Sequence, residues 1–293
     1  MNDYIIYMDA SADVDIDVIK EGGIKCVPME YSLGEEMKTC IGLETTEELK
    51  AFYDSQRGGD LTKTTQIAPY NYVEAFSKDM EEGKSILYFS LSSGLSSTYE
   101  SSCTAKGILE EKYPDARLYC LDTLGATAGI GVLLEHALRN KNNGMSIEDN
   151  FNDLETFKKR VYYTFMVPDL MYLKRGGRVG ASTALLGTAL SIVPMIRIDL
   201  NGKLDTFDKK HGNKQAIKEL AKIAETTHDP ESGESIYIIN ADAPELEASL
   251  TEKVQALFPD TVIKHVGLSP IIGAHTGPGM VAVVTTGREL RTE

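Results

Sequence analysis

The chain has 293 residues, of which 42% are hydrophobic and 25% charged, and its formal net charge is −14. This composition is that of an ordinary globular protein, and the length accommodates one large or two medium domains. The acidic excess excludes nucleic acid as a main partner, because phosphate neutralisation needs a basic face, and it opposes adsorption to anionic membranes.

No apolar run approaches the roughly 20 residues that a membrane span needs. No basic segment followed by an apolar one opens the chain, as it would in a secretory signal. We therefore expect a cytoplasmic protein without stable membrane insertion. The four cysteines form no CxxC pair, and we expect reduced, structural thiols. They are Cys26, Cys40, Cys103 and Cys120.

Apolar runs and amphipathic segments alternate through the first half of the chain. This alternation predicts an α/β domain over residues 1–160 with a doubly wound, mainly parallel sheet. Pro28 places the second strand near a sheet edge. The expected strands are 4–8, 25–33, 86–90 and 117–121, and the expected helices are 45–56, 70–82, 100–113, 125–139 and 146–160.

The second half changes character, because strands and helices are mixed and apolar stretches with small residues appear. We expect an α+β domain over residues 161–293, with a hairpin around Asn201-Gly202. The expected strands are 161–167, 195–200, 203–207, 235–240, 262–266 and 280–286, the expected helices are 215–226 and 243–257, and 269–274 and 275–279 are expected to be a loop and a turn.

The stretch 86–99, ILYFSLSSGLSSTY, runs from a buried strand through small hydroxyl residues into a helix. Unpaired N–H groups at a helix N-terminus, the helix dipole and nearby hydroxyls together favour an anion. Ordinary helix capping by Ser and Thr is the alternative. Six hydroxyl residues exceed what one cap uses, so we interpret this turn as a ligand site.

Further polar turns occur in both halves of the chain. Ser11, Thr64 with Thr65, and Ser92 with Ser93 lie in the first half, whereas Arg178 and His275 lie in the second. Hydroxyls from one domain and a guanidinium and an imidazole from the other would hold a carboxylate or phosphate at the domain interface. Each residue taken singly also has a purely structural interpretation.

Two enzyme classes are alternatives. Ser93, Asp122 and His275 follow the order of an α/β-hydrolase triad, but the chain has no GxSxG motif. A phosphate- or nucleotide-binding enzyme is the other, although GxGxxG and GxxxxGK[ST] are absent. The histidines show no metal-ligand spacing, so we expect no metal and no cofactor.

Five segments in order resemble the motif set of the DegV family, and the resemblance extends over residues 3–288. Any one of them is unspecific, whereas all five in register are informative. They are DASAD at 9–13, TTQ at 64–66, SSGLSSTY at 92–99, LKRGGRVG at 173–180 and HTGPG at 275–279.

The resemblance implies a non-catalytic protein of two α/β domains that binds one long-chain fatty acid between or within them. By position, Thr64 and Ser93 would donate to the carboxylate, with Ser92 or Thr65 as neighbours. Arg178 and His275 would complete the head-group site, and the apolar stretch 181–193 would form a wall of the acyl slot. The family also implies a partner, a kinase related to dihydroxyacetone kinase that makes acyl phosphate for phospholipid metabolism.

The sequence departs from the family pattern in four places. Ala10 stands where the family usually has Ser. Thr65 also replaces a usual Ser, and Ile67-Ala68 replaces the usual Pro-Ser or Pro-Ala. Val193 stands where many members have Lys. The segment 210–212, Lys-His-Gly, replaces an Arg-containing segment that the family ties to kinase coupling. We expect fatty-acid binding to tolerate these changes. The changes at Val193 and at residues 210–212 concern the kinase partnership.

Overall fold

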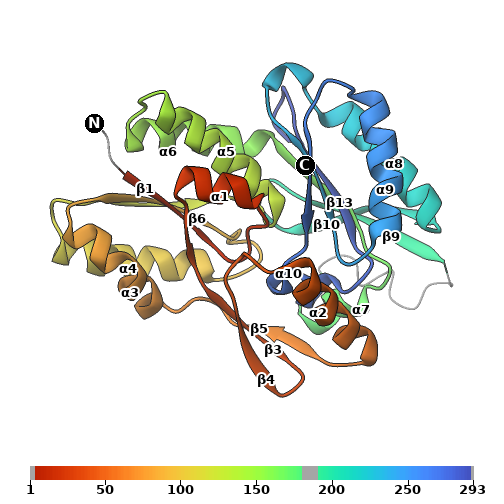
Figure 1. The fold of residues 1–293 in the computed structure, drawn as a ribbon, viewed down its shortest axis with the longest axis horizontal. Coiled ribbons are helices and arrows are strands. Elements are labelled where there is room, and N and C mark those ends of the chain that lie inside the picture. The colour runs from red at the N-terminus through yellow and green to blue at the C-terminus, as the bar shows by residue number, and fades with distance from the viewer. Residues whose placement is uncertain (1–3, 180–190, 292–293) are drawn as a thin grey trace.

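A computed structural model describes residues 4–179 and 191–291, which form three sheets surrounded by helices (Figure 1). The first sheet is parallel throughout, in the strand order β2-β1-β6-β7. Strands β1, β6 and β7 are largely buried, as expected of a parallel sheet with helices on its faces, whereas the edge strand β2 is exposed at Lys25. Their bounds are β1 Tyr4–Asp9, β2 Lys25–Val27, β6 Ser85–Ser90 and β7 Leu118–Asp122.

Helices cover both faces of this sheet, with α3 and α4 on one side and α1, α5 and α6 on the other (Figure 1). The expected α/β architecture of the first half is confirmed. The helices are α1 Ile16–Gly22, α3 Pro69–Glu81, α4 Thr98–Lys112, α5 Ala128–Asn142 and α6 Ile147–Phe157, and a 3-10 turn follows at Lys158–Arg160.

The predicted single strand 25–33 is wrong, because Pro28 divides it between two sheets. Pro28 has no N–H to donate to a ladder, so pairing breaks there. The part after it joins a small antiparallel sheet in the order β4-β3-β5. This sheet, with helix α2, projects from the first half in Figure 1. The bounds are β3 Met29–Leu33, β4 Glu36–Cys40, α2 Thr46–Gly58 and β5 Thr62–Thr64.

The second half is built on a mixed sheet of six strands in the order β10-β9-β8-β13-β11-β12. Only β11 and β12 pair in parallel, and the other neighbours are antiparallel. The expected hairpin around Asn201-Gly202 is confirmed as β9 and β10. The strands are β8 Val161–Met166, β9 Ile192–Ile198, β10 Leu204–His211, β11 Ile236–Asn240, β12 Ile263–Gly267 and β13 Val281–Thr286.

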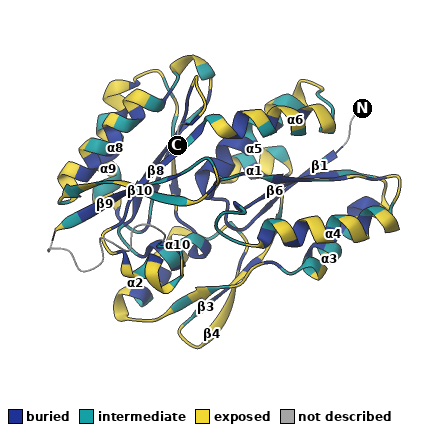
Figure 2. Ribbon diagram, turned by 180° about the vertical axis from the view of Figure 1, so that it is seen from behind, coloured by how far each residue is buried: buried dark blue, intermediate teal, exposed yellow. Residues whose placement is uncertain are grey.

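Helices α8 and α9 cover one face of the mixed sheet, and its other face is turned toward the first half of the chain (Figures 1 and 2). A short 3-10 turn, Pro230–Ser232, follows α8. The remaining helices are α7 Met171–Arg175, α8 Asn213–Thr227, α9 Pro244–Leu257 and α10 Pro270–Thr276.

Two further expectations need correction. The predicted loop 269–274 is the helix α10, because Ser269 at the N-cap and Pro270 in the first turn both favour a helix start. Helix α5 begins three residues later than predicted, because Leu124 and Thr127 have positive φ angles of 49° and 53° and hold the chain in a turn. Most of the stretch 181–193, expected to wall the acyl slot, lies outside the described residues.

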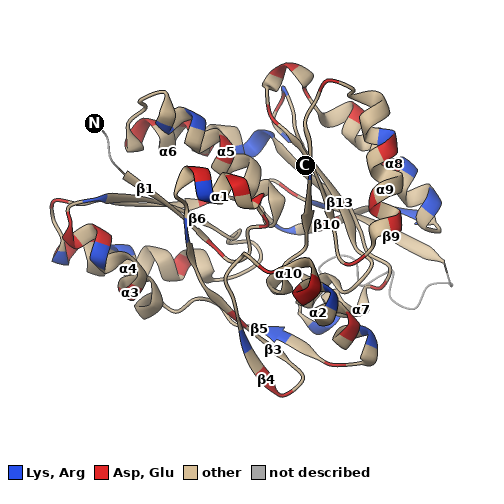
Figure 3. Cartoon of the chain, viewed as in Figure 1, with Lys and Arg blue, Asp and Glu red and all other residues tan. Residues whose placement is uncertain are grey.

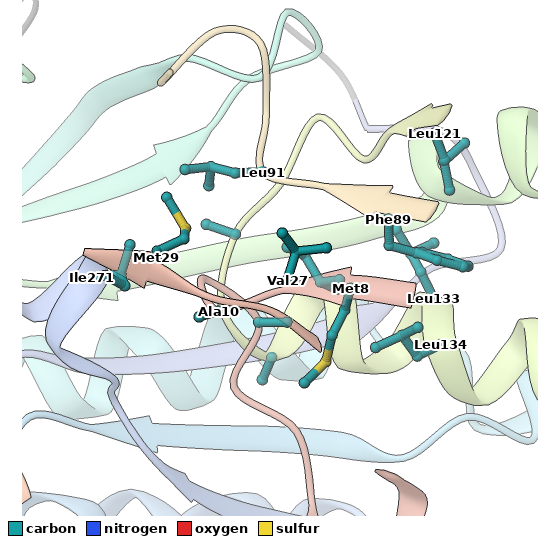
Figure 4. Packing of buried hydrophobic residues seen from close by; sticks show 14 of the residues in the cluster. Met8, Ala10, Val27, Met29, Phe89, Leu91, Leu121, Leu133, Leu134 and Ile271 are labelled. Carbon is teal, nitrogen blue, oxygen red and sulfur yellow. The ribbon is translucent and has the colours of Figure 1, made fainter. Parts of the chain in front are cut away.

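One continuous core joins the two halves. It contains residues of the parallel sheet such as Met8 and Phe89, and residues of the mixed sheet such as Ile239 and Val284. Figure 2 shows the buried strands between exposed outer helix faces, and Figure 4 shows the packing around Met8, Phe89 and Leu133. A second cluster lies under α8 and α9 on the far face of the mixed sheet. The position of the second half is therefore fixed by apolar packing.

Tyr163 packs tightly between the two halves, because its ring lies against Gly125 and Gly129. A Cβ at Gly129 would lie 1.7 Å from Tyr163 Cε1. We predict that Gly129→Ala lowers the free energy of unfolding by about 1–3 kcal/mol through overpacking. Gly107→Ala in α4 is the matched control, because a Cβ there meets nothing within 4 Å. Urea unfolding measures both, and equal stability of the two variants would contradict this packing.

Candidate ligand-binding site

A cavity of about 490 Å³ lies between the turns at one end of the parallel sheet and the inner face of the mixed sheet. This volume is within the range of small-molecule sites. Strands β8, β9, β11 and β13 supply one wall, and the turns after β6 and before α5 supply another. In Figure 4, Leu91, Met29 and Ile271 lie at this edge of the core. The apolar lining includes Leu91, Phe165, Ile198, Ile239, Met280 and Val284.

The serine turn after β6, residues 91–97, is held by carboxylates and by the second half of the chain. Asp9 at the end of β1 accepts from Leu91 N at 2.8 Å and from Tyr88 Oη at 2.9 Å. Ser92 is fully buried, and its hydroxyl donates to the carbonyl of Gly202 at 2.8 Å. Ser92 therefore joins the serine turn to the β9–β10 hairpin and is not among the residues that line the cavity.

Ser93 does line the cavity, and its hydroxyl already has a partner. Ser93 Oγ donates to Asp122 Oδ2 at 2.5 Å, and Ser93 N donates to Asp122 Oδ1 at 3.1 Å. Asp122 stands at the end of β7, the strand beside β6. The parallel register of these strands thus places a carboxylate under the serine turn and fixes the position of Ser93.

Thr64 and His275 come together from opposite halves of the chain. Thr64 Oγ1 and His275 Nε2 are 2.8 Å apart, and both residues line the cavity. Side chains of the first half hold helix α10 in place: Gln56 donates to the carbonyl of Gly273 and Thr62 to that of Ala274, both at 3.2 Å. Several hydrogen bonds between the two halves therefore hold His275 beside Thr64.

His275 is held as neutral imidazole. Burial, and then the charge of Arg178, lower its pKa to about 4. Its Nδ1 has no hydrogen-bond partner and lies against Gly176, where a Cβ would approach Nδ1 to 2.1 Å. A proton on Nε2 rather than Nδ1 therefore fits the surroundings best, because a buried unpaired N–H is costly. In that tautomer His275 donates to Thr64, and the Thr64 hydroxyl is left to donate elsewhere.

Arg178 is the one charged side chain among the described residues that line the cavity, since His275 is neutral. Its Nε and Nη2 donate to the carbonyl of Leu95 at 3.2 and 3.1 Å, and Nη1 donates to that of Gly176. A guanidinium has five N–H groups, so two make no hydrogen bond to the residues that the structure describes. Arg178 thus clamps the serine turn and still offers a positive donor pair to an anion.

Thr65 lines the exposed rim of the cavity together with Gln66 and Ser97. Its backbone N donates to the carbonyl of Glu30 at 3.1 Å. Ser11, expected in a ligand turn, is instead fully buried and donates to Asp9. Tyr163 and Thr127 also line the cavity and were missed, because no local sequence pattern marks a residue whose role depends on two distant elements meeting.

Ser93, Asp122 and His275 are not arranged as the catalytic triad of a hydrolase. A triad needs the imidazole in contact with the nucleophile and the carboxylate in contact with the imidazole. Here Asp122 binds Ser93 directly, and His275 binds Thr64. Over residues 4–179 and 191–291, no group of three or more His, Cys, Asp or Glu residues is arranged to hold a metal ion. Within the same residues, no helix has the length and apolarity to cross a membrane.

Comparison with known proteins gives one consistent family. The model described as "Uncharacterised protein, DegV family" matches residues 4–287. A DegV domain-containing protein of Clostridium perfringens is 34% identical, and the match covers 98% of each chain.

Two solved structures are similar over nearly their whole length. A DegV lipid-binding protein from Thermotoga maritima is 27% identical with a TM-score of 0.81, and the match covers 98% of this chain and 99% of that one. A DegV family protein from Thermus thermophilus, described by its fatty-acid binding, is 25% identical with a TM-score of 0.84, covering 97% and 99%.

The depressed pKa of His275 predicts a stability change with pH. Between its ordinary pKa of 6.5 and about 4, the unfolded chain binds the proton more readily than the folded one. This contribution to stability is therefore complete above pH 6.5 and is lost as the pH falls toward 4. We expect His275→Gln to flatten this part of the profile, measured by urea unfolding from pH 7.5 to 4.5.

His211→Gln is the control for this substitution, because His211 is exposed at the end of β10. We expect that variant to follow the wild-type profile. Parallel curves for the wild type and His275→Gln would show that His275 is not buried as neutral imidazole.

Proposed function

The chain belongs to the DegV family, and from that premise we propose that it binds one long-chain fatty acid in the cavity between its two halves. The observation that carries the proposal is an apolar cavity in which the described lining has a single cation, Arg178, beside hydroxyl and amide donors. That is the donor set of a carboxylate on a long apolar tail. Solved relatives described as lipid-binding or fatty-acid-binding share the fold.

The acyl chain would supply most of the affinity. Each buried methylene contributes about 0.8 kcal/mol, so a chain of sixteen carbons yields roughly 10 kcal/mol before the cost of association is subtracted. The cavity walls are inward-facing residues of β8, β9, β11 and β13, which a sheet places in regular rows. A rigid apolar slot of this kind accepts a flexible chain with little rearrangement of the protein.

The head group would be held by donors from both halves. Thr64 is free to donate when His275 Nε2 carries the proton, and Arg178 has two N–H groups left. Ser93 differs, because its hydroxyl proton is engaged by Asp122. We propose that this hydroxyl rotates about one torsion toward the carboxylate, while Asp122 keeps the backbone N–H of Ser93 and Leu124. Thr65 and Ser92 then lie next to these head-group donors, and Ser92 contributes by holding the shape of the serine turn.

We also propose that the bound acid is presented to a fatty acid kinase. The support is the position of the donors near the exposed rim formed by Thr65, Gln66 and Ser97. In the segment 210–212, Lys210 pairs with Asp208 at 2.7 Å and with Glu219 at 2.8 Å, so its charge is already engaged. Trapping of acyl phosphate as hydroxamate, with ATP and a dihydroxyacetone-kinase-like subunit, tests this; its absence would restrict the function to lipid binding.

The binding itself has a direct test. The purified protein is extracted with organic solvent, and the extract is analysed by mass spectrometry. We expect a saturated or unsaturated long-chain acid at close to one per protein molecule. A delipidated sample should be thermally stabilised by oleate and unaffected by ATP or a sugar phosphate. No acid in the extract and no response to oleate would overturn the proposed function.

Single substitutions test the head-group assignment. Thr64→Val and Ser93→Ala each remove a hydrogen bond to a charged group, worth about 1.5–3 kcal/mol, so we expect roughly 10- to 100-fold weaker binding of oleate. Thr104→Val on the exposed face of α4 is the control, because its hydroxyl contacts only the carbonyl of Glu100. Calorimetric titration measures all three, and wild-type affinity in both site variants would refute the assigned donors.

A further inference from the structure

A second cleft, of about 640 Å³, lies between the two halves of the chain. The turn before α1 and the segment that leads into α2 form one wall, and the ends of β11 and β12 with the start of α9 form the other. No residue that lines this cleft also lines the cavity proposed for the fatty acid. A ligand held here would therefore not compete with the fatty acid for space.

Five carboxyl groups line the cleft, and two of them, Asp13 and Glu44, have no basic partner within residues 4–179 and 191–291. The other three pair with basic side chains: Asp15 with Lys264, Asp242 with Arg57 and Glu247 with His265. The lysine of the lining, Lys50, pairs with Asp54, which lies outside the cleft. The cleft therefore offers two carboxyl groups that lack a countercharge.

Asp13 is buried and only half satisfied. Its exposed fraction is 6%, and its Oδ1 accepts from the backbone N of Ser269 at 2.9 Å. Its Oδ2 has no hydrogen-bond partner among the described residues. An ionised Asp13 lacks a donor at Oδ2, and a protonated one lacks an acceptor there. Either form leaves a buried polar atom unpaired, which is costly unless a ligand completes the site.

Glu44 and an apolar wall adjoin Asp13 in the cleft. The loop that carries Glu44 contacts the turn of Asp13, because a Cβ at Gly42 would lie 3.7 Å from the carbonyl oxygen of Ala12. Glu44 is half-buried and accepts from the backbone N of Ile41 at 2.9 Å. The apolar lining is Val14, Ile16, Leu43, Leu49, Pro244 and Val266. The described part of the chain has no group of three ligands that could hold a metal ion, so the cleft suits an organic cation.

We propose that this cleft binds a small aliphatic amine, whose ammonium donates to Asp13 Oδ2 and to Glu44 and whose carbon chain packs on the apolar wall. The ammonium supplies the donor that Oδ2 lacks and the countercharge that offsets the burial of a carboxylate. Besides Glu44, the titratable groups that face Asp13 are Tyr53 on α2 and Cys40 at the end of β4. Burial raises the pKa of both and keeps them uncharged, and neither can supply a positive charge.

Calorimetric titration of the purified protein with n-butylamine tests the site, and n-butanol is the uncharged control. We expect the amine to bind and the alcohol not to. Asp13→Asn and Glu44→Gln should each weaken binding of the amine about ten-fold or more, because each removes a charged acceptor. Asp260→Asn should bind as the wild type does, because Asp260 is exposed after α9 and outside the cleft. Absence of amine binding, equal binding of n-butanol, or wild-type affinity in both cleft variants would refute the site.

The pH dependence of the same titration tests Asp13 directly. Burial, opposed by hydrogen bonds from Ser269 and reinforced by the charge of Glu44, raises the pKa of Asp13 to about 8. Below that pH an incoming ammonium must displace the Asp13 proton. We therefore expect the affinity to fall roughly ten-fold per pH unit from pH 7.5 to 6 and to stay constant from pH 8.5 to 9.5. Asp13→Asn should remove this slope, and a wild-type affinity that does not change with pH would show that Asp13 does not hold the ammonium.

Discussion

The hydrogen bond from Ser92 to the carbonyl of Gly202 is the contact on which the ligand cavity depends. It ties the serine turn of the first half to the hairpin of the second. The approach is so close that a Cβ at Gly94 would lie 2.6 Å from the carbonyl oxygen of Asn201. The Ser92 hydroxyl and the carbonyl of Gly202 satisfy each other only when the two halves meet in this arrangement, so the contact adds a directional constraint to the apolar packing that joins them.

Polar groups elsewhere in the site repeat this arrangement, since each donor is positioned by a second group. Asp122 orients Ser93, and the carbonyls of Leu95 and Gly176 orient Arg178. Burial, and then the charge of Arg178, keep His275 neutral by lowering its pKa. Arg178 is therefore the one cation of the described cavity lining, which suits a monoanionic carboxylate. The other acidic and basic side chains are distributed widely over the helices and loops of the chain (Figure 3).

The sequence by itself determined the α/β character of the first half, the hairpin at Asn201-Gly202 and the family, because periodicity, turn chemistry and ordered motifs are local signals. Five of the six predicted site residues line one cavity, the exception being Ser92. Only the tertiary structure decided that Ser93 donates to Asp122, that His275 lies on a helix, and that Thr64 meets His275. Those facts depend on strand order and packing between distant elements, which a linear pattern does not record.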